Sequence, residues 1–168
     1  LNNCIVSSNT AVHEGGGGIW NNAAGIMTIN NCLISNNTIN EAVGYVGNGG
    51  GMVNAAYFGN IPQLTINNST ISGNSTNLDT ATSQGGGIYN SGGQLDINQS
   101  TINNNTAKAN GGGIYSGSYS DTEINHSTIS QNIATSGSGG GIQSSALGGN
   151  NNLTLNYVTL TGNLAATN

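Results

Sequence analysis

Two acidic side chains occupy equivalent positions in successive repeats of the chain. Asp96 lies in the segment LDI and Glu123 in the segment TEI, with Asp121 close by. Stacking of these repeats as β-strands would bring the Cα atoms of Asp96 and Glu123 to about 5 Å from each other. Retaining glycosidases hold two carboxylates roughly 5–5.5 Å apart. The pair is therefore a candidate for polysaccharide cleavage or for weak calcium binding.

The surroundings of this pair argue against catalysis. Thr65 and Thr154 fill the same position in the flanking repeats, and neither Lys nor Arg shares the column. A lyase of this architecture would need a base or calcium-binding carboxylates. We therefore expect a solvated surface pair, with no catalytic residue, no metal and no cofactor. A carbohydrate-active enzyme that uses Asp96 and Glu123 is the alternative function.

Aromatic residues form a second candidate site. Trp20, Tyr89 and Tyr115 follow glycine-rich segments at an outward position, which Val53 and Gln143 fill in the other repeats. Exposed aromatic side chains stack on sugars or dock a protein partner. They also stabilise neighbouring strands through cross-strand contacts. The sequence leaves both roles open.

The longest repeat carries two insertions, roughly Thr38–Asn48 and Ala55–Gln63, and the second of these contains Tyr57 and Phe58. Loops inserted on one face of a repeat protein often form its binding surface. We predict that any specific partner binds there. The alternative is a loop that packs over the flank of the protein.

Threonines recur at one outward column, namely Thr70, Thr101, Thr128 and Thr159. Two residues on lie Ser72, Asn103, Ser130 and Thr161. The arrangement resembles the regular threonine-rich faces of ice-binding β-helices, although Ile5 and Leu33 interrupt the threonine column and Asn103 interrupts its neighbour. β-branched residues are also what strand propensity alone would place on an outward face. Ice binding is therefore a third functional hypothesis.

Cys4 and Cys32 occupy the same inward position in adjacent repeats. Stacked strands would place their Cα atoms within the range that a disulfide spans. A disulfide is plausible in an extracellular protein, and two buried thiols are an equally good interpretation. The chain has no CxxC motif, which argues against a metal or redox site.

A repeat of about 30 residues positions all of these side chains. One module begins at Leu1, Ile29, Ile66, Ile97, Ile124 and Leu155, and a GGGI or GGGM module begins at Gly16, Gly49, Gly85, Gly111 and Gly139. Each repeat holds three short pieces that alternate with a period of two, as β-strands do. The pattern predicts an all-β, single-stranded, right-handed parallel β-helix (β-solenoid) over residues 1–168, with about six coils of roughly 27–37 residues. This single domain would be a segment of a longer solenoid or a filament subunit.

The alternation also predicts which side chains point inward, for example Leu64, Ile66, Ser69, Ile71 and Ile88. Two asparagine columns are complete: Asn2, Asn30, Asn67, Asn98, Asn125 and Asn156, and then Asn9, Asn37, Asn74, Asn105, Asn132 and Asn163. Asparagine tolerates the left-handed conformation that a sharp corner requires. Stacked amides can also hydrogen-bond to one another. Both columns are therefore interpreted as structural.

The repeated modules resemble those of bacterial polymorphic outer-membrane proteins and related large β-helical surface proteins. That family pairs a GGA[I/L/V] motif with an FxxN motif. Gly85–Ile88 and Gly111–Ile114 match the first motif, while Ile71–Asn74 and Ile129–Asn132 match the second with Ile in place of Phe. The resemblance covers the whole chain and implies a surface-displayed adhesin or passenger.

Composition excludes several functions. Charged residues make up 4% of the chain, Lys108 is its only basic residue and the net charge is -5, so nucleic-acid binding is not expected. No apolar run approaches the roughly 20 residues that span a bilayer. The leading hypothesis is an extracellular or cell-surface structural or adhesive protein that is not an enzyme. Its expected partners are further copies, stacked head to tail, or a cell-surface glycan or protein.

Overall fold

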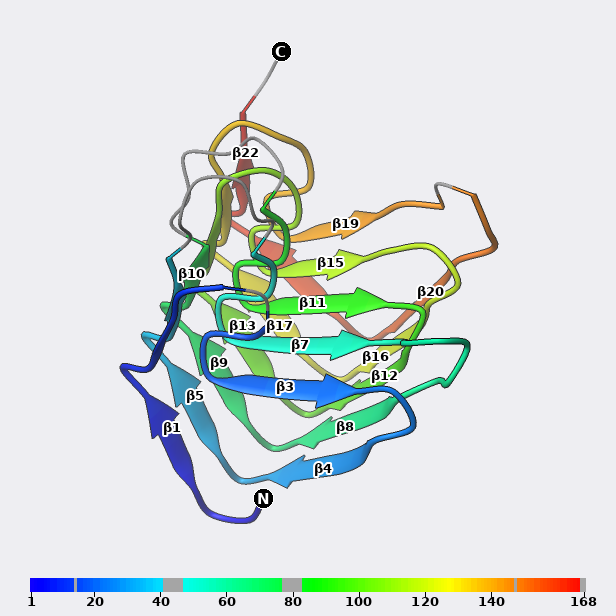
Figure 1. Cartoon of the computed structure of the whole chain (residues 1–168). Helices are drawn as coiled ribbons and strands as arrows, with labels where there is room; N and C mark the ends of the chain where they lie inside the picture. Colours follow the sequence, from blue (N-terminus) through cyan, green and yellow to red (C-terminus); the bar gives the residue numbers. More distant parts are fainter. Residues whose placement is uncertain (14, 41–46, 77–82, 147, 167–168) are drawn as a thin grey trace.

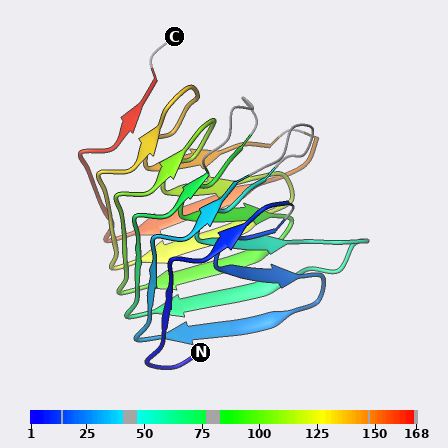
Figure 2. The same ribbon diagram turned by 60° about the vertical axis from the view of Figure 1, so that its left-hand side comes forward.

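The computed structural model describes residues 1–13, 15–40, 47–76, 83–146 and 148–166. These residues form a parallel β-helix, in which the chain passes repeatedly through the same sheets in the same order (Figure 1). The strands of successive turns stack side by side along the axis (Figure 2). This part of the chain contains no helix long and apolar enough to cross a membrane. The predicted all-β parallel solenoid is confirmed.

Each turn contributes one strand to each of four sheets. Sheet I contains β1 (Ile5–Ser7), β5 (Leu33–Ser35), β9 (Thr70–Ser72), β13 (Thr101–Asn103), β17 (Thr128–Ser130) and β21 (Thr159–Thr161). Sheet II contains β2 (Thr10–Ala11), β6 (Thr38–Ile39), β10 (Ser75–Thr76), β14 (Thr106–Ala107), β18 (Ile133–Ala134) and β22 (Leu164–Ala165). Sheet III contains β3 (Ile19–Asn22), β7 (Met52–Ala55), β11 (Ile88–Ser91), β15 (Ile114–Ser116) and β19 (Ile142–Ser144). Sheet IV contains β4 (Ile26–Asn30), β8 (Gln63–Asn67), β12 (Gln94–Asn98), β16 (Asp121–Asn125) and β20 (Asn152–Asn156).

The strand count corrects two details of the sequence prediction. Two of the sheets have six strands and two have five, so the described chain makes about five complete turns, slightly fewer than the six coils predicted. Each turn also holds four strands, whereas three were predicted. The strands of sheet II were missed because each has two residues, which is too short to show an alternating pattern.

The core consists of stacked aliphatic columns, as the alternation predicted. Ile66, Ile71 and Ile88 are fully buried, Leu64 is nearly so, and each stands in register with its counterparts in neighbouring turns. Burying an aliphatic side chain of this size contributes roughly 1.5–3 kcal/mol. No single turn can enclose such a side chain alone, so the stack stabilises each of its members.

A ladder of buried amides runs along the corner between sheets I and II. Asn37, Asn74, Asn105 and Asn132 are 0% exposed. The backbone N–H and Nδ2 of Asn105 both donate to Oδ1 of Asn132, each at 3.0 Å, and Nδ2 also donates to the carbonyl of Ile71 at 3.0 Å. Its own Oδ1 accepts the same pair of bonds from Asn74. Every polar group of the ladder is thus satisfied, which buried amides require.

The second asparagine column forms a half-exposed ladder with the opposite direction. Nδ2 of Asn98 donates to Oδ1 of Asn67 at 3.0 Å, and Nδ2 of Asn125 donates to Oδ1 of Asn98 at 3.1 Å. The left-handed backbone predicted for both columns is wrong: in the buried ladder the residue before each asparagine takes it, as Asn104 does with φ of 54°. The amide stacking predicted for the half-exposed column is confirmed, but its asparagines are not left-handed either. The residues that follow them take that conformation, with φ of 49° at both Gln99 and His126. The ladder asparagines instead end the strands of sheet IV.

The glycine triplets are required by close contact between turns. Gly85 has φ of 68°, a conformation that side chains rarely adopt. A Cβ on Gly86 would collide with the backbone oxygen of Gly112 in the next turn. A Cβ on Gly87 would lie 2.7 Å from the oxygen of Gly113 and 3.0 Å from Nδ2 of Asn105. The third glycine of the triplet therefore makes room for the buried ladder.

We predict that Asn105→Ala lowers the free energy of unfolding by about 3 kcal/mol, because it leaves Asn74 and Ile71 with unpaired buried groups. The matched variant Asn98→Ala, in the half-exposed ladder, should cost under about 1 kcal/mol, since water replaces the lost partner. Urea unfolding followed by circular dichroism measures both values. Equal losses in the two variants would contradict the assigned role of the buried ladder.

Candidate functional site

The aromatic row of sheet III lies in register across the sheet. Trp20 pairs with Val53, Val53 with Tyr89, Tyr89 with Tyr115, and Tyr115 with Gln143. All five positions face away from the core, because the residues that flank them in each strand line its inner side. The row was correctly predicted from the position after each GGGI or GGGM module.

Exposure within this row is unequal, which corrects the expectation of an exposed aromatic stripe. Trp20 is 49% exposed, while Val53 and Tyr115 are only 5% and 6% exposed. The rings of Tyr89 and Tyr115 stack with centroids 5.3 Å apart and planes 5° apart. Burial raises the pKa of Tyr89 above its ordinary value, a hydrogen bond from Ser91 opposes this, and Tyr115 adds to the increase. The tyrosine stack therefore packs the sheet surface, and Trp20 is the residue of the row with a large accessible ring.

Part of the cover over Tyr115 is backbone that the sequence could not place. A Cβ on Gly117 would lie 3.0 Å from Cε1 of the Tyr115 ring. The chain therefore passes close to the ring edge directly after β15. A bulkier residue at position 117 would displace this segment.

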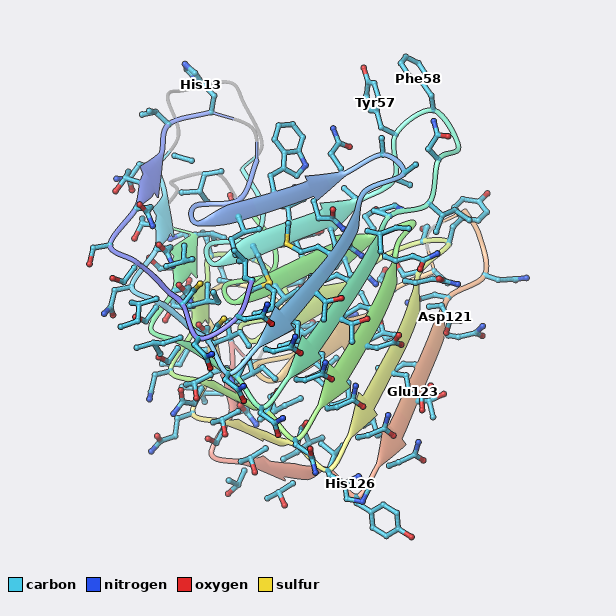
Figure 3. The ribbon with its side chains drawn as sticks, turned by 90° about the horizontal axis from the view of Figure 1, so that it is seen from below. His13, Tyr57, Phe58, Asp121, Glu123 and His126 are labelled. Carbon is cyan, nitrogen blue, oxygen red and sulfur yellow. The ribbon has the colours of Figure 1, made fainter. Side chains whose placement is uncertain are left out.

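The loop between β7 and β8 displays a separate group of apolar side chains. Tyr57, Phe58 and Ile61 are 57%, 87% and 56% exposed, and Figure 3 shows Tyr57 and Phe58 projecting outward from the loop. The two rings meet edge to face with centroids 4.2 Å apart. This loop is the second predicted insertion. Of the first, residues 41–46 lie outside the described part of the chain.

The backbone of this loop is strained at its most exposed residue. Phe58 has φ of 50°, a conformation uncommon for residues other than glycine and asparagine. The turn is closed by Asn60, whose backbone N–H and Nδ2 donate to the carbonyl of Tyr57 at 3.1 and 3.3 Å. The corner residues Gln99 and His126 have the same left-handed backbone, so in this fold the conformation marks a turn. The loop thus holds two aromatic rings in water at a local energetic cost.

The acidic pair lies on the outer face of sheet IV, where Asp96 of β12 pairs in register with Glu123 of β16. The predicted juxtaposition is confirmed. Glu123 accepts a hydrogen bond from Nδ2 of Asn125 at 3.1 Å, and Figure 3 shows Asp121 and Glu123 along the same strand. Partial burial, and then the charges of Glu123 and Asp121, raise the pKa of Asp96 above its ordinary value. Two carboxyls side by side, one of them with a raised pKa, are the starting point of an acid and base pair in a glycosidase.

The residues around this acidic pair do not complete a catalytic or metal-binding site. Thr65 and Thr154 flank it in the same column, and the pair lies on an outer sheet face. Among the described residues there is no group of three or more His, Cys, Asp or Glu side chains that could hold a metal ion. Register therefore places Asp96 beside Glu123, and neither residue lines either of the two hollows found among the described residues.

Cys4 and Cys32 are free thiols that stack in adjacent turns. Sγ of each donates to the carbonyl two residues earlier at 3.1 Å, and Sγ of Cys32 accepts the backbone N–H of Cys4 at 3.3 Å. Ser69 continues this pattern, since its Oγ accepts the N–H of Cys32 and donates to the carbonyl of Asn67. Both cysteines also border a shallow hollow of about 480 Å³ beside Ile5 and Leu33.

A third asparagine ladder was missed by the sequence analysis. Nδ2 of Asn21 donates to Oδ1 of Asn54 at 2.8 Å, and Nδ2 of Asn54 donates to Oδ1 of Asn90 at 2.9 Å. In the next turn Ser116 takes the equivalent position, and Nδ2 of Asn90 bonds instead to Oγ1 of Thr122. The signal was present two residues after each GGGI-type module, but the column changes residue type after three turns.

These features define a parallel β-helix repeat protein with a uniform core and a different chemistry on each outer face. Two segments, residues 68–91 and 99–117, match the model of the Chlamydia polymorphic membrane protein (Chlamydia_PMP) repeat. Each segment contains an IxxN module followed by a GGGI module, so the family resemblance predicted from these modules is confirmed. Comparisons with curated proteins and with solved structures gave no match.

We predict that Asp96→Asn raises stability at neutral pH. The folded-state pKa of Asp96 is raised above its ordinary value of 3.8. The stability linked to this carboxyl is therefore fully present below about pH 3.8 and is lost as the pH rises through the raised folded-state value. Asparagine does not ionise, so the variant should gain under about 1 kcal/mol at pH 7, a small value because solvent screens the pair.

Urea unfolding at pH 7 and at pH 3 measures this effect. The gain should be nearly absent at pH 3, below the ordinary value of 3.8, because Asp96 is then protonated in the folded and the unfolded chain. It should shrink in 1 M salt, which screens the repulsion by Glu123 and Asp121. A loss of stability in the variant at pH 7 would contradict the repulsion assigned to the pair.

Proposed function

We propose that this chain is the β-helical portion of an extracellular, cell-surface adhesive protein that binds its partner without catalysis. The match to the polymorphic membrane protein repeat supports a surface location. The aromatic loop between β7 and β8 carries the proposal of adhesion, because Phe58 is 87% exposed at a turn that Asn60 closes. An exposed apolar group of this kind marks an interaction site.

The proposed binding site combines Trp20 with Tyr57 and Phe58. Trp20 lies on β3, which pairs in register with β7, and β7 leads directly into the loop that carries the other two rings. The three side chains thus come from adjacent turns. Aromatic rings with open faces stack on the apolar faces of sugars, and they also anchor protein interfaces. The proposed partner is a cell-surface glycan or protein.

The β-helix suits this role because it is already rigid before a partner binds. Three amide ladders and the aliphatic columns fix each turn against the next. A loop supported by such a rigid body loses little conformational entropy on binding. The surface chemistry of the loop can also vary without any change in the core.

We predict that Trp20→Ala and Phe58→Ala each weaken binding to cells or to an immobilised glycan library. A single aromatic contact contributes about 0.5–1.5 kcal/mol, which corresponds to a loss of about two- to tenfold in affinity. The matched control is Tyr157→Ala, which removes an 84% exposed ring that stacks on His126 with centroids 4.9 Å apart. The Tyr157→Ala variant should bind with the same affinity as the unmodified chain.

Two results would count against adhesion through this site. One is an equal loss of binding in all three variants, which would indicate a non-specific aromatic effect. The other is release of sugars from a polysaccharide that is lost in Asp96→Asn and in Glu123→Gln. That outcome would favour the alternative enzyme, which the raised pKa of Asp96 supports.

We further propose that copies of the chain stack head to tail. Leu155, Leu160 and Leu164 line the C-terminal end of the described stack and are 40%, 52% and 61% exposed. Leu155 and Leu160 are core positions, in register with the fully buried Ile124 and Ile129. Leu164 faces outward, as its counterpart Ile133 does. At the opposite end Asn9 donates to Asn37 through its N–H and Nδ2, which leaves its Oδ1 open to donors such as the N–H of Asn163. The two ends therefore present complementary halves of the same ladder.

We predict that the sedimentation coefficient rises with protein concentration and that Leu160→Asp abolishes this rise, because a charge at a core position blocks stacking. The control is Thr159→Asp, which places the same charge on the outer side of the same strand. Sedimentation velocity compares the three proteins. A concentration-independent monomer, or an equal effect of both variants, would contradict head-to-tail stacking.

A further inference from the structure

We propose that the outer face of sheet I, over β9, β13, β17 and β21, binds ice. This site is separate from the aromatic loop and does not depend on the proposed adhesive function. It consists of two parallel rows of short polar side chains. The first row is Thr70, Thr101, Thr128 and Thr159, and the second is Ser72, Asn103, Ser130 and Thr161.

The two rows form a regular two-dimensional array. Each member pairs in register with its counterpart in the next strand, so neighbours within a row are about 4.8 Å apart. The two residues of each strand on this face are separated by one inward residue, which places the rows about 6.6 Å apart. The array therefore repeats along two directions, as the water molecules on a face of an ice crystal do.

The hydroxyl groups of this face are available to an external ligand. In the described structure none of its Ser or Thr hydroxyls hydrogen-bonds to the protein, whereas Thr38 and Ser75 on sheet II pair with each other at 3.2 Å. Asn103 interrupts the second row, because it carries no hydroxyl and its Oδ1 is buried away from an external ligand. The face thus carries unused hydrogen-bonding capacity at regular intervals.

The composition of the face also fits ice and not a charged or apolar partner. The six strands of sheet I contain no charged residue, so no side chain imposes the strong local hydration of an ion. Each threonine presents a methyl group beside its hydroxyl. Its β-branched side chain is restricted at χ1, and the rigid stack behind it fixes the backbone. Little entropy is then lost when the array orders water.

The array has a definite boundary. The first row continues toward the N-terminus as Ile5 and Leu33, which carry no hydroxyl. These two residues and Thr70, at the edge of the array, border the shallow hollow beside the thiols. The proposed face is therefore limited to the four C-terminal strands of sheet I.

Thermal hysteresis in a nanolitre osmometer tests the proposal with the full chain. We expect the chain to hold ice crystals in a faceted shape and to depress their growth temperature below their melting temperature. Thr101→Tyr and Thr128→Tyr, in the centre of the array, should each lower this hysteresis severalfold because a projecting ring prevents contact between the flat faces. The matched control Thr65→Tyr, on the outer face of sheet IV, should leave it unchanged. Circular dichroism melting checks that all variants are folded.

Three results would contradict ice binding by this face. An absence of hysteresis and of crystal shaping in the unmodified chain would overturn the proposal, as would equal hysteresis in Thr101→Tyr and the unmodified chain. Retention on crystalline cellulose or chitin without any effect on ice would reassign the array to a polysaccharide surface. Trp20→Ala should keep full hysteresis, which separates this result from the outcome of the adhesion experiment.

Discussion

The buried amide ladder between sheets I and II is the interaction on which the rest of the structure depends. A buried amide is tolerated only when all of its polar groups are bonded, and each asparagine here obtains its partners from the turns on both sides. The ladder therefore fixes the register of every turn against the next. It also determines the glycine triplets, because Nδ2 of Asn105 lies 3.0 Å from the place where a Cβ on Gly87 would be. The register between turns, the corner between sheets I and II and the close contact at the glycine triplets all follow from the need to bond every buried amide.

Most of this could be predicted from the sequence because repetition makes the constraint visible. The inward position of Ile71, the column of Asn105 and the pairing of Asp96 with Glu123 all follow from counting residues between equivalent modules. The failures have physical causes. The sheet II strands have two residues each and cannot show a period, and the left-handed residues follow the exposed asparagines, where residue type varies from Gln99 to His126.

The candidate site was harder to predict because burial at outward positions is set by neighbours distant in sequence. Tyr115 and Trp20 occupy equivalent positions and have the same predicted orientation, yet their exposures are 6% and 49%. The backbone at Gly117 and the stacked ring of Tyr89 account for cover over Tyr115. Periodicity reports which side of a strand a residue faces. It does not report what lies over that side.

The outer faces can differ from one another because the inner columns maintain the fold. The molecule therefore offers two kinds of binding surface. A repeated column such as Thr70 to Thr159 offers the same group at a constant spacing, which suits a ligand that is itself periodic. The loop with Tyr57 and Phe58 occurs in one turn only, so it breaks the repeat and suits a ligand with a single defined shape. Since function resides in sites and not in folds, one β-helix can carry both. Substitutions in either site leave the amide ladder, and hence the other site, in place.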